Sequence, residues 1–237
     1  VYENKDDSWT KIGDDIDGED SGDYYGYAVS LNSNGSIVAI GASSNDGNGN
    51  NSGHVRVYEN KDDSWTKIGD DIDGEYSDDY SGYSVSLNSN GSIVAIGADG
   101  NDGNGINSGH VRVYENKDGI WTQIGDDIDG EASRDYSGSS VSLNGNGNIV
   151  AIGTRFNDGN GANSGHVRVF GYSSDSWTQI GDDIDGDASG DYSGKSVSLN
   201  SNGSIVAIGA RFNDGNGTDS GQVRVFKLWL QSFLANF

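Results

Sequence analysis

The chain has 237 residues and no Cys, and 14 basic against 37 acidic residues give it a formal net charge of −23. The absence of Cys excludes disulfides, thiol catalysis and thiolate metal sites. Nucleic acid is not expected as a partner, because phosphate binding needs a basic surface. No apolar run is long enough for a membrane span.

A unit of 56 residues recurs through the chain, since Val1-Tyr2-Glu3-Asn4 returns at Val57 and again at Val113. A fixed period of this size indicates one supersecondary unit stacked on copies of itself. We expect these repeats to form one domain over residues 1–226. The hydrophobic segment 227–237 has no repeat partner, and we expect it to pack on the repeats, contact a partner or mediate self-association.

The second unit shows the predicted elements in chain order. Tyr83–Leu87 alternates like a strand with two different faces, and an Asn-Gly turn follows it. Ile93–Gly97 is a continuous β-branched run, typical of a strand buried on both faces. A Gly/Asn loop then leads to the alternating strand His110–Tyr114. A turn and the strand Ile120–Ile124 complete the unit, and a polar connection leads to the next one.

Four short strands without any helical period predict one blade of an all-β propeller with four-stranded antiparallel sheets. One sheet cannot bury both faces alone, but sheets packed around an axis cover one another. A linear β-solenoid is the alternative. The first Trp strand, 8–12, precedes any complete unit, and the last unit, 195–226, lacks such a strand. The two termini therefore either close a ring of four blades, or the chain forms part of a larger propeller.

The order of several short motifs resembles the FG-GAP repeats of integrin α-like β-propellers. An aromatic-Gly opening (Tyr25-Gly26-Tyr27), a strand end (Gly41-Ala42) and a Gly-led strand (53–58) follow one another as in that family. The resemblance implies a β-propeller with an extracellular or cell-surface role in recognition or adhesion. The family's calcium loop lies between its first two strands, where this chain has only the short turn 32–36, so that site is not carried over.

One group of repeated acidic loops offers candidate calcium ligands between the second and third strands. Alternating Asp and Asn oxygens along a Gly-flexed loop suit a hard cation. An ordinary loop whose side chains cap its own backbone is the alternative. The candidate ligands are Asp46, Asn48, Asp102, Asn104, Asp158, Asn160, Asp214 and Asn216.

The polar connection between units carries a second candidate loop with the pattern Asp-x-Asp-Gly, which is half of a calcium loop. Gly69 stands where a first ligand would be needed. Calcium is the one cofactor that these two kinds of loop suggest, and acidic residues that serve solubility alone are the alternative. The candidate ligands here are Asp71, Asp73, Asp127 and Asp129.

His and Arg also recur once in each unit. His54, His110 and His166 begin the third strand of their units, where Gln222 stands in the fourth, and we expect them to be exposed. Successive units should hold these side chains too far apart for a shared metal. The Arg residues two positions later should point to the polar side and pair with the acidic loops. They are Arg56, Arg112, Arg168 and Arg224.

The sequence shows no nucleophile elbow, zinc-protease motif or phosphate loop, and near-identical repeats offer little asymmetry for a catalytic site. We therefore expect no enzyme. The expected function is an extracellular recognition or adhesion module that binds protein or glycan through its loops. The alternative is a calcium-stabilised structural or surface-assembly protein. A specific site is expected where the copies differ, at Arg155, Arg211, Gln222 and the tail 228–237.

Overall fold

A computed structural model, which describes residues 1–228, shows an all-β chain of twenty strands, with no helix among these residues. Three antiparallel sheets have four main strands and one short strand each, a fourth sheet has three strands, and an N-terminal hairpin stands apart. The predicted blades are confirmed. No helix of the described part is long and apolar enough to cross a membrane.

All four larger sheets share one strand order, with the second strand between the first and the third. The first strands are β3 (Tyr25–Leu31), β8 (Ser81–Leu87), β13 (Ser140–Leu143) and β18 (Ser193–Leu199). The second strands are β4 (Ile37–Ala42), β9 (Ile93–Ala98), β14 (Ile149–Thr154) and β19 (Ile205–Ala210). The third strands are β5 (His54–Lys61), β10 (His110–Lys117), β15 (His166–Ser173) and β20 (Gln222–Lys227).

The fourth, Trp-bearing strands are β6 (Ser64–Lys67), β11 (Ile120–Gln123) and β16 (Ser176–Gln179). The N-terminal hairpin pairs β1 (Tyr2–Lys5) with β2 (Ser8–Lys11). In the repeat, β1 corresponds to the last residues of a third strand, and β2 corresponds to a fourth strand. The polar connections, predicted without structure, contain short strands that pair with the start of the third strand. They are β7 (Ile72–Asp73), β12 (Ile128–Asp129) and β17 (Ile184–Asp185).

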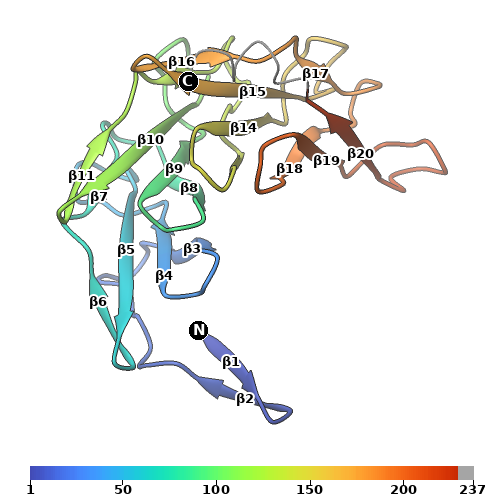
Figure 1. Ribbon diagram of the computed structural model, residues 1–237. Helices are drawn as coiled ribbons and strands as arrows, with labels where there is room; N and C mark the ends of the chain where they lie inside the picture. Colours follow the sequence, from blue (N-terminus) through green and yellow to red (C-terminus); the bar gives the residue numbers. More distant parts are fainter. Residues whose placement is uncertain (229–237) are drawn as a thin grey trace.

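The blades follow one another along an arc (Figure 1), with the first strands toward its concave side and the Trp strands toward its convex side. The hairpin β1–β2 lies at one end of this arc and the sheet β18–β20 at the other. These two form separate sheets within residues 1–228, so the described termini do not join into one blade. The described residues therefore form an open arc, and not the ring of four blades closed by both termini.

The core lies between neighbouring blades. Val94 and Ala95 of β9 point to opposite faces of the sheet and are both fully buried, which confirms the prediction of a second strand covered on both faces. Val55 and Val57 of β5 pack with Val85 of β8 in the next blade. Equivalent clusters fill the two following gaps. Burial of each such side chain stabilises the fold by about 1.5–3 kcal/mol, so stability depends on neighbours rather than on single blades.

Polar contacts that recur at each interface hold the blades in register. The indole Nε1 of Trp121 donates to the Ile68 carbonyl of the preceding blade at 2.8 Å. On the concave side, backbone amides of the first turns donate to carbonyls of the next turn, as Ser89 does to Gly145 at 3.0 Å. Apolar contacts alone would allow neighbouring blades to pack in several similar positions, and these hydrogen bonds select one of them.

Candidate functional site

The first set of predicted calcium loops lies at one end of each blade, between the second and third strands. Asp46 Oδ1 accepts a hydrogen bond from the backbone amide of Asn51 at 2.7 Å. The Asn48 amide donates to the Gly74 carbonyl at 2.8 Å. The same two bonds recur in the second blade at Asp102 and Asn104, and in the third at Asp158 and Asn160. In the last blade, Asp214 accepts from the backbone amide of Asp219, and the backbone amide of Asn216 donates to the Ser220 hydroxyl.

The second set of predicted loops lies directly beside the first, because Asn48 reaches the carbonyl that follows Asp73. Asp73 and Asp129 are exposed. Asp71 accepts two hydrogen bonds from the guanidinium of Arg56, at 2.8 and 2.6 Å, and these bonds hold the pKa of Asp71 well below its usual range. The predicted Arg–acid pairing is thus observed, and the two predicted loops meet at one place in each blade.

The three His residues are buried, and the prediction that they are exposed is wrong. His54, His110 and His166 are 2%, 4% and 1% exposed. The short strands β7, β12 and β17 pair with the starts of β5, β10 and β15, which places an Asp backbone directly opposite each His. Burial lowers the pKa of all three, to about 4 for His110 and His166.

Each buried His stands beside one Glu and one Asp that the sequence had not linked to it. The ligand atoms of each group lie within 4.8 Å of one another, an arrangement that could hold a metal ion. The Glu comes from the connection that enters the blade and the Asp from the connection that leaves it. The groups are Glu19–His54–Asp71, Glu75–His110–Asp127 and Glu131–His166–Asp183.

A guanidinium already occupies the first two groups. Arg56 bridges Asp71 and Glu19. Arg112 lies 2.7 Å from Asp127 and 2.6 Å from Glu75. A metal ion there would have to displace a cation that binds a carboxylate through two hydrogen bonds. These pairs also tie each blade to the connection from the preceding one.

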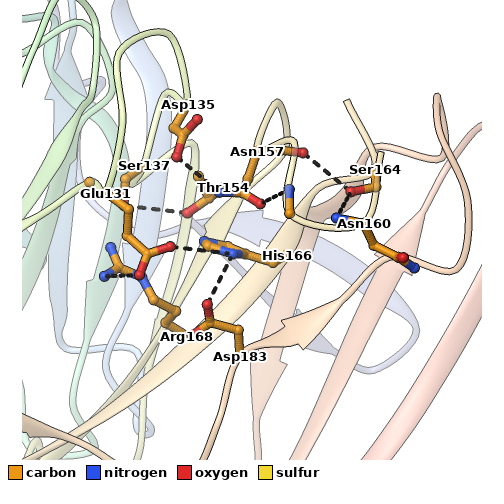
Figure 2. Close-up of polar contacts among 12 residues, drawn as sticks. Glu131, Asp135, Ser137, Thr154, Asn157, Asn160, Ser164, His166, Arg168 and Asp183 are labelled. Carbon is orange, nitrogen blue, oxygen red and sulfur yellow. Dashed lines mark hydrogen bonds and ion pairs between the residues drawn. The ribbon is translucent and has the colours of Figure 1, made fainter. Parts of the chain in front are cut away.

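The third group, which is drawn in Figure 2, differs from the other two in the contacts of its Arg. His166 Nδ1 lies 3.7 Å from Asp183 and 3.9 Å from Glu131, so both carboxylates face the imidazole. The Arg168 guanidinium donates to the backbone carbonyl of Asp129 at 2.6 Å, and its distance to the Glu131 carboxylate is 3.7 Å. This group is therefore the most open of the three to a cation.

The copies differ most on the concave side, where three blades contribute to one cluster. Arg155, at the end of β14, donates to the Tyr83 hydroxyl at 3.0 Å and lies 3.4 Å from Asp99. The Tyr83 ring packs against Tyr27 of the first blade at a tilt of 46°, with centroids 4.9 Å apart. The equivalents of Arg155 are Ser43, Asp99 and Arg211. We call Tyr27, Tyr83, Asp99 and Arg155 the concave cluster.

The protonation state of the concave cluster depends on the burial of the Asp99 carboxyl group, since Asp99 is only 4% exposed. Burial raises the pKa of Asp99 to about 7, although Arg155 and Lys195 act against this shift. The carboxyl group can therefore give or take a proton near neutral pH. Arg155 was singled out in the sequence because it departs from the repeat, but its partners in the second blade could be found only from the fold.

An aromatic row continues from this cluster along the same end of the blades. Arg155 lies over the Phe156 ring, 4.9 Å from its centroid. The rings of Tyr136, Phe156, Tyr192 and Phe212 follow one another at 5.2–5.3 Å, each pair within ordinary aromatic contact. The row joins the concave cluster to the last blade.

A family model described as the FG-GAP repeat matches residues 128–170 and 177–226. This part of the chain carries FG-GAP repeats. The resemblance predicted from the short motifs is confirmed, and the matched residues span the third and fourth blades. No curated protein matches the chain.

Two solved structures resemble the fold of this chain. A putative 6-phosphogluconolactonase from Bacteroides uniformis is 13% identical, with a TM-score of 0.55 over 84% of this chain and 49% of the other. Hydrazine synthase from Kuenenia stuttgartiensis is 11% identical, with a TM-score of 0.56 over 90% of this chain and 49% of the other. The chain spans about half the length of either protein.

These similarities correct one prediction. The expectation of no enzyme, which rests on the small asymmetry of repeated blades, is wrong as an argument, since these two structures both bear the names of enzymes. The concave cluster shows why it fails, because near-identical blades still bring different residues together on the concave side. At such low identity the likeness shows the fold alone and assigns no reaction to this chain.

Proposed function

We propose that this chain is an extracellular or cell-surface recognition module that binds a protein or glycan ligand at the concave cluster. The observation that carries the proposal is the contact of Arg155 with Tyr83 and Asp99, together with that of Tyr83 with Tyr27, because these contacts join different residues from three blades at one place. Tyr and Arg are the side chains that contribute most to binding energy at protein interfaces. Tyr27, which is half exposed, adds an aromatic face of the kind that stacks on sugars.

The test compares Arg155→Ser, which copies Ser43 of the first blade, with Arg134→Ser on an exposed loop. Loss of a hot-spot Arg typically costs about 2 kcal/mol or more, so we expect Arg155→Ser to weaken binding at least about 30-fold. Binding is measured by titration with hits from a glycan array and a surface-protein panel. Equal affinity in both variants, or no saturable binding to either panel, would contradict the proposal.

Calcium-stabilised structural or surface assembly is the second candidate, and the meeting of the two predicted loops beside Asp73 favours it. If calcium binds there, millimolar calcium should raise the melting temperature and EDTA should lower it. A ligand at 100 times its Kd stabilises a fold by about 2.7 kcal/mol. Magnesium at equal ionic strength is the control, and Asp73→Asn combined with Asp129→Asn should reduce the response. A melting temperature that calcium does not change would count against this candidate.

A further inference from the structure

The third group, Glu131–His166–Asp183, lacks the cation that the other two groups hold. In the first two groups, one guanidinium nitrogen lies within hydrogen-bond distance of both carboxylates. The equivalent Arg168 instead donates to the Asp129 carbonyl and lies over the Phe170 ring, 5.3 Å from its centroid. Among the described residues, its one ion pair with this group is 3.7 Å long. The two carboxylates therefore converge on one imidazole without a cation between them.

The carboxylate oxygens of this group divide their roles in the same way. Asp183 Oδ1 accepts from the Gln179 side-chain amide at 2.7 Å, and Asp183 Oδ2 faces His166 Nδ1 at 3.7 Å. Glu131 Oε1 faces Arg168, and Glu131 Oε2 faces His166 Nδ1 at 3.9 Å. In each carboxylate, an outer partner orients one oxygen and the other oxygen points to the imidazole. Outer partners orient the ligands of metal sites in this manner.

The imidazole of His166 is buried without a hydrogen-bond partner among the described residues. The side chain is 1% exposed, and both contacts of Nδ1 are longer than a hydrogen bond. The other ring nitrogen, Nε2, is also buried and unpaired. A buried polar group without a partner destabilises a fold. A metal ion on Nδ1 would give that nitrogen the partner that it lacks.

The ligand types indicate which metal fits. Calcium and magnesium prefer oxygen ligands alone, whereas zinc binds imidazole nitrogen and carboxylate oxygen together. All three ligand atoms lie within 4.8 Å of one another. With bonds of about 2.1 Å, two ligand atoms of a tetrahedral zinc ion lie about 3.4 Å apart. The two carboxylates are partly exposed, so they can close this difference around an ion that enters from solvent.

We infer that Glu131, His166 and Asp183 bind one zinc ion through Oε2, Nδ1 and Oδ2, with the fourth position left to water. Because Glu131 lies on the connection that enters the third blade and Asp183 on the one that leaves it, the ion links both connections to the start of β15. This site goes beyond the recognition function proposed above and does not depend on it. It also lies apart from the calcium candidate at Asp73 and takes a different class of metal.

The first test is a calorimetric titration of the EDTA-stripped and dialysed protein with zinc chloride, in millimolar calcium and magnesium. We expect one site per chain. Loss of an outer partner typically lowers metal affinity about 10–100-fold, so loss of a ligand in His166→Gln or Glu131→Gln should lower it at least about 100-fold. His166→Gln copies Gln222 of the last blade, and Glu131→Gln changes a partly exposed side chain, so at least one of them should fold.

His110→Gln is the matched control, because it removes the buried His of the second group, where Arg112 already binds both carboxylates. It should leave zinc affinity and stoichiometry unchanged. A parent protein that does not bind zinc, equal affinity in the parent and both ligand variants, or an equal loss in the control would each overturn the inference.

Imidazole signals in nitrogen NMR identify the ligand atom, because the chain has only three His. We expect zinc to shift the signals of one His, most strongly at Nδ1, and His166→Gln should lack these signals. Equal shifts of all three His, or a shift centred on Nε2, would contradict the inference.

Gln179→Lys tests the missing cation in the third group. It copies Lys67 of the first blade, which lies 2.7 Å from Asp71, so the last-placed side chain is one that the fold already accepts at this position. The ammonium group should bind Asp183 and repel zinc, and we expect at least about 10-fold weaker zinc binding. Unchanged affinity in this variant would overturn the inference.

Discussion

Gly153→Ala is expected to destabilise the protein by about 3 kcal/mol or more, the largest effect of any single methyl group that we foresee. The new Cβ would lie 2.0 Å from the Gly194 carbonyl oxygen. Both atoms belong to backbones inside packed sheets, so neither can move without separating two blades. Urea unfolding of the variant and the parent, followed by Trp fluorescence, measures the difference in unfolding free energy.

Gly209→Ala is the matched control for this prediction. Both glycines face the hydroxyl of a Ser on the first strand, at 2.3 Å for Gly153 and 2.4 Å for Gly209, and a hydroxyl can rotate away. Only Gly153 faces a carbonyl of the next blade. We expect Gly209→Ala to cost about 1 kcal/mol or less in dilute protein. Equal losses in the two variants would show that the contact between blades does not set the cost.

Acid is expected to destabilise the protein through its three buried His residues. Burial holds the pKa of His110 and His166 near 4 in the folded state, against about 6.5 when unfolded. The unfolded chain therefore binds more protons, so this stability is complete above pH 6.5 and is lost as the pH falls toward 4. The loss is about 3 kcal/mol for each of the two residues.

The control uses the residue that the fourth blade already has, Gln222. A variant with His54→Gln, His110→Gln and His166→Gln should show a flatter dependence of unfolding free energy on pH between 7 and 4. Buried carboxyls such as Asp99 act in the opposite direction, because their raised pKa favours the folded state as the pH falls, but they are common to both proteins. Measurements in EDTA keep metal off the His groups. Parallel pH curves would contradict the prediction.

The fold could be predicted closely where side chains alone decide the structure. Ile93–Gly97 was predicted as a buried strand, and Ile93–Ala98 is observed, because an unbroken β-branched run has no other stable place in so polar a chain. The third strand was expected to stop at Tyr114 but continues to Lys117. Its polar end pairs with the Trp strand, as Glu115 does with Thr122, so backbone pairing extends a strand that the apolar pattern does not mark.

Most of the site could not be predicted, and one missed element explains much of this. Ile72–Asp73 is too short to show a period, so the connection between units was interpreted as a loop and His54 as exposed. In the structure this short strand covers His54 and brings Asp71 beside it. The spacing of 15 residues from Arg56 to Asp71, kept in Arg112 and Asp127, was the available signal. The concave cluster depends on contacts between blades, which no single repeat contains.

The contact of the Leu87 amide with the Ser30 hydroxyl returns as Leu143 with Ser86 and as Leu199 with Ser142. This contact is therefore built from the same atoms at each of the three seams. Unequal recombination that inserted or removed one whole unit would join closely similar surfaces, so it would leave the remaining seams intact. Copy number in genes of this kind is thus free to change at little cost to folding, while side chains on the concave side diverge from copy to copy.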